Sequence, residues 1–492
     1  MLKRALATVT LVGAFVAGTR AIVPMPPERV SQTTTSPAQA LERAIEQELT
    51  RRGGVGATVA AVANGRVLLA RNFGRRSADS PAAVSEDTLF GIGSVTKQFT
   101  AAATLLLAED GKLSVNDKVA KYFPGLTRAN DITLLDLMNH VSGYPDYYPL
   151  DFVDRRMLAP IAPDALIDRY AGAPLDFEPG TRWSYSNTGF VLLGRILEKA
   201  GGRPLGSFLR ERIFTPLGMT RTLYEPARNE RRVAPGYTSF ALTKLAPAAQ
   251  EGDGWVGAAG AIYSTAADIA RWDIALMEGR VLKPASWDLM TRPRLLANGN
   301  SSNYGCGLSV GTRDGVTVFT HGGAVSGFIA RNTFVPQTRS AVVVIINDED
   351  GPLANALVEH AMKAVLPERA AQVPVTTGPS AARADRGAIP RVAGPEPGAQ
   401  ASALFRALQA GTLDRSGLGE EYSVFATPAK VRAASLVLKP LGEITGVDVR
   451  SIGERGGMEV SSVRLTLGSK ALDALMYRST DGKVQEYLLF QP

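Results

Sequence analysis

Short apolar runs typical of β-strands lie near both ends of the first 370 residues. Two of them flank Asn64-Gly65, a pair that favours a tight hairpin because both turn positions need positive φ. Helical patterns precede this group at 38–50 and end the region at 353–365. Three further β-type runs, with turns between them, lie at 315–320, 328–334 and 341–346.

Residues 112–270, between the two groups of strands, have the spacing of helices and loops. The clearest helices are expected at 132–139, 189–199 and 269–277. Strands at both ends of a region with a helical insert between them predict an α+β fold whose sheet joins the two ends.

One helical pattern, running from Ser94 to Asp110, carries a lysine three residues after its first serine. Three residues are nearly one helical turn, so Ser94 and Lys97 lie on one face within reach of each other. Gly111 has the place of a glycine that ends a helix. From spacing alone, the ordinary interpretation is a helix-capping serine and a surface lysine. The alternative is a nucleophile beside its proton acceptor, because a lysine in a dry pocket can lose its charge.

The chain changes character after residue 370. Residues 371–400 are rich in Pro, Ala and Gly, have no hydrophobic period and predict a linker. Helical patterns at 401–410 and 428–438 then precede four β-type segments. These segments lie near 444–451, 457–468, 471–478 and 484–490. We expect a separate small α+β domain over 401–492, of the cystatin-like or NTF2-like kind, and it contains no cluster that points to catalysis.

The first residues have the pattern of a secretory signal peptide, which we expect over 1–21. Two basic residues precede an uncharged run at 5–19 that is shorter than the ~20 apolar residues of a spanning helix, so we expect export with removal. A disordered, Pro-, Thr- and Ser-rich lead-in is expected at 22–37 and the main domain over 38–367.

The composition and charge of the chain argue against several classes of protein without pointing to one function. The 492 residues carry a net charge of +7, without a long Lys/Arg run or aromatic residues among basic ones, which argues against nucleic-acid binding. Cys306 is the single cysteine and there are three histidines, so neither an internal disulfide nor a zinc site is expected. We expect no cofactor, no metal and no stable membrane span. Export and one cysteine fit the bacterial periplasm or secretion, and the oligomeric state stays open.

Several motifs follow one another through the main domain in a fixed order: FGIGSVTKQFT, LLDLMNHVSGYPDY, FEPGTRWSYSNTGFVLLG, TPLGMTRT and HGGAVSGF. Together they resemble the serine penicillin-recognising hydrolases, in the branch of class C β-lactamases, D-alanyl-D-alanine carboxypeptidases, D-aminopeptidases and β-lactamase-like esterases. The resemblance covers about residues 40–367. It implies a β-lactamase/transpeptidase-like domain, with an antiparallel sheet flanked by helices and an all-helical insert.

The resemblance also implies a role for individual residues. Ser94 would be the nucleophile that forms an acyl-enzyme, and Lys97 would hold Ser94 and share its proton. Tyr185 would be the general base or proton shuttle, since nearby cations can stabilise a phenolate. Asn187 would hydrogen-bond Lys97 and the carbonyl region of the substrate, unless it only caps the following helix. The backbone N–H groups of Ser94 and Ala324 would form the oxyanion hole.

His321 stands where related enzymes carry a lysine. A histidine is mostly neutral near pH 7, so it offers no fixed charge to a substrate carboxylate or to Tyr185. Gly322 lacks the hydroxyl that a threonine would offer, while Gly322 and Gly323 fit a strand that lets a substrate backbone lie close. These differences favour a peptidase or an esterase over a true β-lactamase.

We expect structural rather than catalytic roles for two further residues. His140 is expected to orient its loop through hydrogen bonds, and Cys306 is expected to be a small buried residue.

Other classes of protein compete with this interpretation. Ser94 lies in Ile-Gly-Ser-Val-Thr rather than in Gly-x-Ser-x-Gly, so the nucleophile elbow of an α/β-hydrolase is absent. A non-catalytic protein that binds cell-wall peptide or a partner has no need of Ser94, Lys97, Tyr185 and Asn187 together. The sequence therefore predicts an exported serine hydrolase that forms an acyl-enzyme with an ester, a D-amino-acid peptide or a β-lactam.

Overall fold

The structure is a computed structural model. It describes residues 36–313, 315–366 and 390–492. The expected signal peptide, nearly all of the lead-in and most of the linker lie outside these ranges and stay predictions. In the described ranges, no helix is both long and apolar enough to cross a lipid bilayer.

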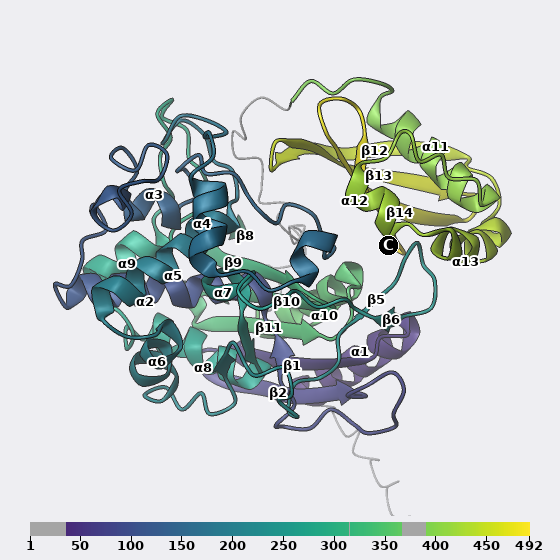
Figure 1. The fold of residues 1–492 in the computed structure, drawn as a ribbon. Helices are drawn as coiled ribbons and strands as arrows, with labels where there is room; N and C mark the ends of the chain where they lie inside the picture. Colours follow the sequence, from purple (N-terminus) through teal and green to yellow (C-terminus); the bar gives the residue numbers. More distant parts are fainter. Residues whose placement is uncertain (1–35, 314, 367–389) are drawn as a thin grey trace, which may run out of the picture. The chain divides into compact units, whose positions relative to one another are not determined.

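Six antiparallel strands form the main sheet, and they come from both ends of the predicted main domain (Figure 1). Their order is β2-β1-β11-β10-β9-β8. Their bounds are β1 Gly56–Ala63, β2 Arg66–Gly74, β8 Ser309–Arg313, β9 Val316–Val325, β10 Phe328–Val335 and β11 Ser340–Ile346. Asn64 and Gly65 have φ of 53° and 76° and make the predicted hairpin turn. The expected sheet and the α+β class are confirmed, while β8 was not predicted.

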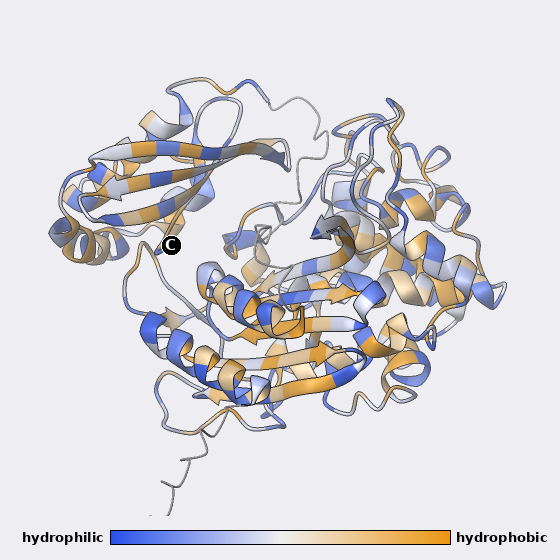
Figure 2. Cartoon of the chain, turned by 180° about the vertical axis from the view of Figure 1, so that it is seen from behind, coloured by the Kyte–Doolittle hydropathy of each residue, from blue (hydrophilic) through white to orange (hydrophobic). Residues whose placement is uncertain are grey.

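Both faces of this sheet are buried, which explains the unbroken apolar run of its central strand. Val342, Val344 and Ile346 of β11 belong to the core formed with α1 (Pro37–Arg52) and α10 (Gly351–Val365). The alternate residues of β11 belong to the core on the other face, because side chains of a strand point to opposite sides. Figure 2 shows the resulting pattern, with largely hydrophobic strands behind helices that are partly polar.

Between β2 and β8 the chain forms mainly helices and loops, which includes the predicted helical region at 112–270. The three expected helices are α3 (Leu134–Met138), α5 (Asn187–Gly201) and α8 (Ala266–Met277). The helical pattern that starts at Ser94 is α2 Thr96–Glu109, as expected, and the others are α4 Pro163–Ala171, α6 Leu205–Leu209, α7 Gly257–Gly260 and α9 Pro284–Thr291. Five strands of two or three residues were not predicted, since they are too short to show alternation. They are β3 Phe90–Gly91, β4 Leu223–Tyr224, β5 Tyr237–Thr238, β6 Ala246–Pro247 and β7 Ile262–Ser264.

The C-terminal segment, residues 390–492, has helices followed by a four-stranded antiparallel sheet in the order β12-β13-β14-β15. The elements are α11 Pro397–Ala410, α12 Glu420–Phe425, α13 Pro428–Leu438, β12 Gly446–Arg455, β13 Met458–Leu467, β14 Lys470–Arg478 and β15 Val484–Phe490. The helix α11 starts inside the predicted linker, because proline is tolerated in the first turn of a helix. The described residues from Pro37 onward belong to one compact unit, so a separate domain over 401–492 and its fold type stay predictions.

Candidate active site

Ser94 lies in a 3₁₀ turn, η1 (Gly93–Val95), directly before α2. Val95 occupies the cap position of α2 and no side chain caps that helix, so the interpretation of Ser94 as a helix cap is wrong. Lys97 has no exposed surface, so the interpretation as a surface lysine is wrong as well. Its Nζ atom donates hydrogen bonds to Ser94 Oγ at 3.1 Å, Asn187 Oδ1 at 2.7 Å and the Ala259 carbonyl at 2.8 Å.

Two opposing effects act on the charge of Lys97. Burial lowers its pKa well below the usual range of a lysine, and the positive charge of Arg455 acts in the same direction. The carboxylate of Asp146 opposes this effect. The three acceptors around Nζ also match the three N–H bonds of an ammonium group. Lys97 can therefore lose its proton in this site, and the same site can also bind its protonated form.

Tyr185 lies beside this pair, with its ring centroid 4.8 Å from Lys97 Nζ. Its hydroxyl is buried and makes no hydrogen bond of standard geometry within the described chain. Burial raises the pKa of Tyr185 above its usual value, while the nearby Ser94 hydroxyl acts in the opposite direction. The site therefore favours the neutral phenol of Tyr185. A protonated phenol can act as a proton shuttle, whereas a general base would have to be a phenolate.

His140 holds the segment that carries Tyr185, as expected. Its Nδ1 atom accepts a hydrogen bond from the Ser186 N–H at 3.1 Å, and its carbonyl accepts one from Ser184. Its ring centroid is 4.3 Å from that of Tyr185 and 5.1 Å from that of Phe190. His140 thus fixes the backbone and the ring position of the candidate shuttle.

Asn187 joins Lys97 to Asp146, a residue to which we assigned no role from the sequence alone. Its side-chain amide donates to Asp146 Oδ1 at 3.0 Å and to the Tyr148 carbonyl at 3.4 Å, and its backbone N–H also donates to Asp146. The cap of α5 is Ser186, so the interpretation of Asn187 as a cap is wrong. Asp146 lies within the LLDLMNHVSGYPDY motif, but only the fold brings it to Asn187.

The strand β9 passes so close to η1 that two positions require glycine. A Cβ atom on Gly323 would lie 2.0 Å from the Ile92 carbonyl oxygen and 3.1 Å from Ser94 N. A Cβ atom on Gly93, which has φ of +49°, would lie 2.7 Å from Ala324 N. The glycine at 323 thus serves the contact between the strand and the nucleophile turn, and the predicted contact with a substrate backbone stays a prediction. This approach puts the backbone amides of Ser94 and Ala324 side by side.

His321, on β9 as predicted, is held as a neutral imidazole. Its Nδ1–H donates to the carbonyl of its neighbour Gly322 at 2.6 Å, so Nε2 accepts from the Tyr304 hydroxyl at 2.9 Å. Burial, aided by the charge of Lys97, lowers the pKa of His321 to about 3. His321 therefore offers no positive charge at neutral pH. Tyr304, which fixes this state, carried no signal in the sequence.

Cys306 is fully buried, as expected, and burial raises the pKa of its thiol to about 12. Within the described ranges, no group of three His, Cys, Asp or Glu side chains is arranged to hold a metal ion.

Known proteins resemble this chain over the same region. The Beta-lactamase family model matches residues 41–366. A penicillin-binding protein of Bacillus subtilis (strain 168) is 30% identical over 308 residues, which are 60% of this chain and 68% of that protein. A D-aminopeptidase of Gluconobacter oxydans (strain 621H) is 29% identical over 343 residues, or 68% of this chain and 64% of that protein.

Solved structures agree with these relatives. The crystal structure of D-amino acid amidase from Ochrobactrum anthropi SV3, complexed with L-phenylalanine amide, aligns with a TM-score of 0.59 at 25% identity. The alignment covers 67% of this chain and 99% of the amidase. The family model spans all the candidate residues from Ser94 to Ala324. The chain therefore belongs to the beta-lactamase family of serine hydrolases.

Proposed function

We propose that this protein is an exported hydrolase that acylates Ser94 and cleaves amides or esters of D-amino acids, including short D-amino-acid peptides. The observation that carries the proposal is the hydrogen bond of 3.1 Å from the fully buried Lys97 to the partly exposed Ser94. The D-aminopeptidase and D-amino acid amidase among its relatives support the substrate class. The neutral His321 gives further support, because it supplies no cation for the carboxylate of a β-lactam.

Acylation begins when Ser94 Oγ attacks the carbonyl carbon and its proton passes to the neutral amine of Lys97. The backbone N–H groups of Ser94 and Ala324 stabilise the negative oxygen of the tetrahedral intermediate. The Tyr185 hydroxyl gives its proton to the leaving amine or alkoxide and takes one from Lys97. Water then attacks the acyl-enzyme, the acid product leaves, and Ser94 regains its proton through the same groups.

Labelling with a fluorophosphonate probe tests whether Ser94 is a nucleophile. We expect the wild-type protein to react and the S94A variant, with an unchanged melting temperature, to remain unlabelled. Equal labelling of both, or no labelling of the wild type, would favour the alternative of a non-catalytic protein that binds cell-wall peptide or a partner.

A substrate panel on one enzyme sample tests the class. We expect hydrolysis of a D-alanine amide or a short-chain nitrophenyl ester, and slow or no turnover of a chromogenic cephalosporin. Fast turnover of the cephalosporin without amidase or esterase activity would overturn the proposed substrate and retain the nucleophile.

A further inference from the structure

The turn between β12 and β13 brings a cation of the C-terminal segment to the loop beside the candidate site. Arg455, the last residue of β12, donates from Nη2 to the Tyr148 carbonyl at 3.3 Å and from Nη1 to Asp151 Oδ1 at 3.1 Å. Only 13% of its side chain is exposed. The next residue, Gly456, has φ of +57°, and a Cβ atom there would lie 2.6 Å from Pro149 Cβ. The turn is therefore packed directly against residues 148–151.

The Tyr148 carbonyl connects Arg455 to the nucleophile. It accepts both the Arg455 guanidinium and the side-chain amide of Asn187, which lies 3.4 Å away. The oxygen of the same amide accepts from Lys97 at 2.7 Å, and Lys97 donates to Ser94. A continuous series of hydrogen bonds thus runs from the C-terminal segment to Ser94 Oγ.

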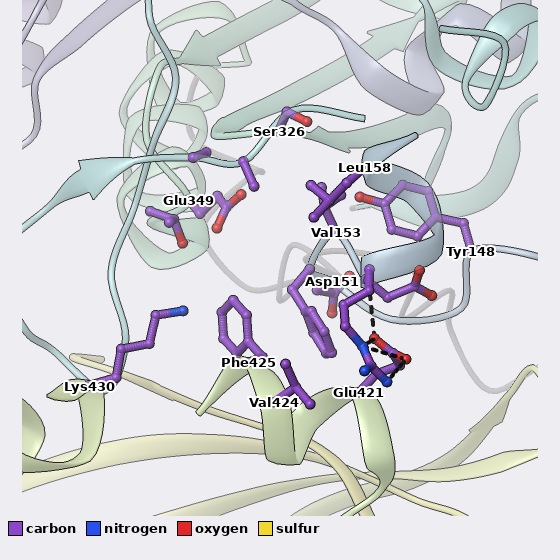
Figure 3. A pocket seen from close by; sticks show the side chains of 16 residues that line it. Tyr148, Asp151, Val153, Leu158, Ser326, Glu349, Glu421, Val424, Phe425 and Lys430 are labelled. Atoms are coloured by element: carbon purple, nitrogen blue, oxygen red, sulfur yellow. Dashed lines mark hydrogen bonds and ion pairs between the residues drawn. The ribbon is translucent and has the colours of Figure 1, made fainter. Parts of the chain in front are cut away.

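Other residues of the C-terminal segment hold the same loop. Asp151 accepts a hydrogen bond from the Tyr477 hydroxyl at 2.8 Å, and its own N–H donates to Glu486 Oε2 at 2.8 Å. Tyr148 and Asp151 also line one side of a cavity of about 240 Å³, and Val424 and Phe425 of α12 line the other side (Figure 3). Residues 148–151 are therefore held against the C-terminal segment by several contacts rather than by the ion pair of Arg455 and Asp151 alone.

The positive charge of Arg455 favours the deprotonated forms of Lys97 and Tyr185, which can accept a proton. It lowers the pKa of both Lys97 and Tyr185, which stabilises a neutral amine and a phenolate. His321 provides no such charge because it is neutral. Asp151 partly offsets the guanidinium charge, and Asp146 acts on Lys97 with the opposite sign.

We propose that Arg455 is a positioning residue of the hydrolase site: it fixes the Tyr148 carbonyl, and through it Asn187 and Lys97, and it supplies positive charge that His321 does not. The inference rests on the proposed function. It implies that a chain ending near residue 370 would lose activity, since such a chain lacks Arg455.

The test compares R455M and R455K with R450M in the full-length protein. Arg450 lies on the same strand, but it is about half exposed and forms an ion pair with the exposed Asp448, so R450M is a matched control. We expect R455M to lower kcat and the rate of probe labelling by about 10- to 100-fold with little change in KM, because small displacements of catalytic groups cost that much. R455K, which keeps the charge but not the fork of two nitrogens, should restore part of kcat.

Melting temperatures separate positioning from folding. The inference is supported if R455M loses kcat and R455K recovers part of it. Both variants must also have melting temperatures close to that of R450M. Equal activity of R455M and R450M overturns the inference, as does a loss of activity that follows melting temperature and that lysine does not relieve. A wild-type protein that neither reacts with the probe nor turns over substrate instead overturns the proposed function.

Discussion

Individual side chains show how burial shapes this site. Lys97 and Ser94 were predicted as a pair from their spacing, but spacing could not show that Lys97 loses all contact with solvent. Burial depends on α5 and on the loop at Asp146, which come from distant parts of the sequence. The same burial favours the neutral forms of Lys97, Tyr185 and His321.

Replacing Tyr185 by phenylalanine should separate function from stability. The Tyr185 hydroxyl is buried without a hydrogen bond of standard geometry, and the nearby Ser94 hydroxyl keeps its hydrogen bond from Lys97 when the phenol oxygen is removed. We expect Y185F to keep or slightly raise the melting temperature while kcat falls by about 100-fold or more. A variant that retains most of its kcat, measured beside its thermal unfolding curve, would remove Tyr185 from the proton path.

The buried Asp348 should make stability depend on pH. It is 1% exposed, and burial raises its pKa to about 6, although the Val55 and Asp350 N–H groups donate to it. Because the folded state binds this proton more tightly than the unfolded state, stability relative to D348N should fall as pH rises from about 4 to about 6, by up to about 3 kcal/mol. Urea unfolding at several pH values measures this difference. A difference that stays constant over the range would contradict the assignment.

At the scale of elements, the contact of β9 with η1 decides the geometry of the candidate site. Strand β9 could be expected from its own apolar pattern and its glycines. Its approach to η1 could not, because it depends on where β3, η1 and α2 lie after folding. The glycine at 323 indicated a close approach, and the structure shows that a turn of the protein itself lies against it.

Substituting Gly323 by alanine should move β9 away from η1. The added Cβ atom would overlap the Ile92 carbonyl, and backbone atoms cannot yield as a flexible side chain can. We expect a loss of about 1–3 kcal/mol in stability and a larger fractional loss of kcat. The control is G311A on the edge strand β8, where the nearest atom would be 3.7 Å away, an ordinary contact. Similar effects of the two substitutions would contradict the role of close packing at 323.

At the scale of the whole molecule, one hydrophobic core includes residues from both parts of the chain. Phe152 packs in the core of the C-terminal segment, with its ring centroid 4.5 Å from Phe425 and 6.1 Å from Tyr422. No pattern in the sequence connects Phe152 with Tyr422 or Phe425, which lie 270 and 273 positions further along the chain. Their contact makes the C-terminal segment a structural neighbour of the candidate site.

Truncating Phe152 should therefore weaken the whole described unit. We expect F152A to lower the free energy of unfolding by about 3–5 kcal/mol, because a large, mostly buried ring is lost from the core. V424A, at a position 45% exposed, should change it by about 0.5 kcal/mol or less. Guanidinium unfolding of both variants gives the comparison, and a single transition is expected. Equal stabilities of F152A and V424A would show that the core is not shared.

The sequence by itself determined the local elements and the order of the chemical groups. Three features depend only on neighbours in the chain and could therefore be predicted from the sequence alone. They are the turn at Asn64-Gly65, the apolar periods, and the spacing of Ser94 and Lys97. The motifs from Ser94 to Ala324 also indicated the family that the comparisons confirmed.

Only the tertiary structure decided which of these groups meet and in which state of charge. Asp146, Tyr304 and Arg455 act through contacts between residues far apart in sequence, and no periodic pattern marks such contacts. Protonation follows burial and neighbouring charge, which exist only after the chain has folded. For that reason the hydrogen bond of His321 with Tyr304 and the contact of Arg455 with the Tyr148 carbonyl had to be found in the structure.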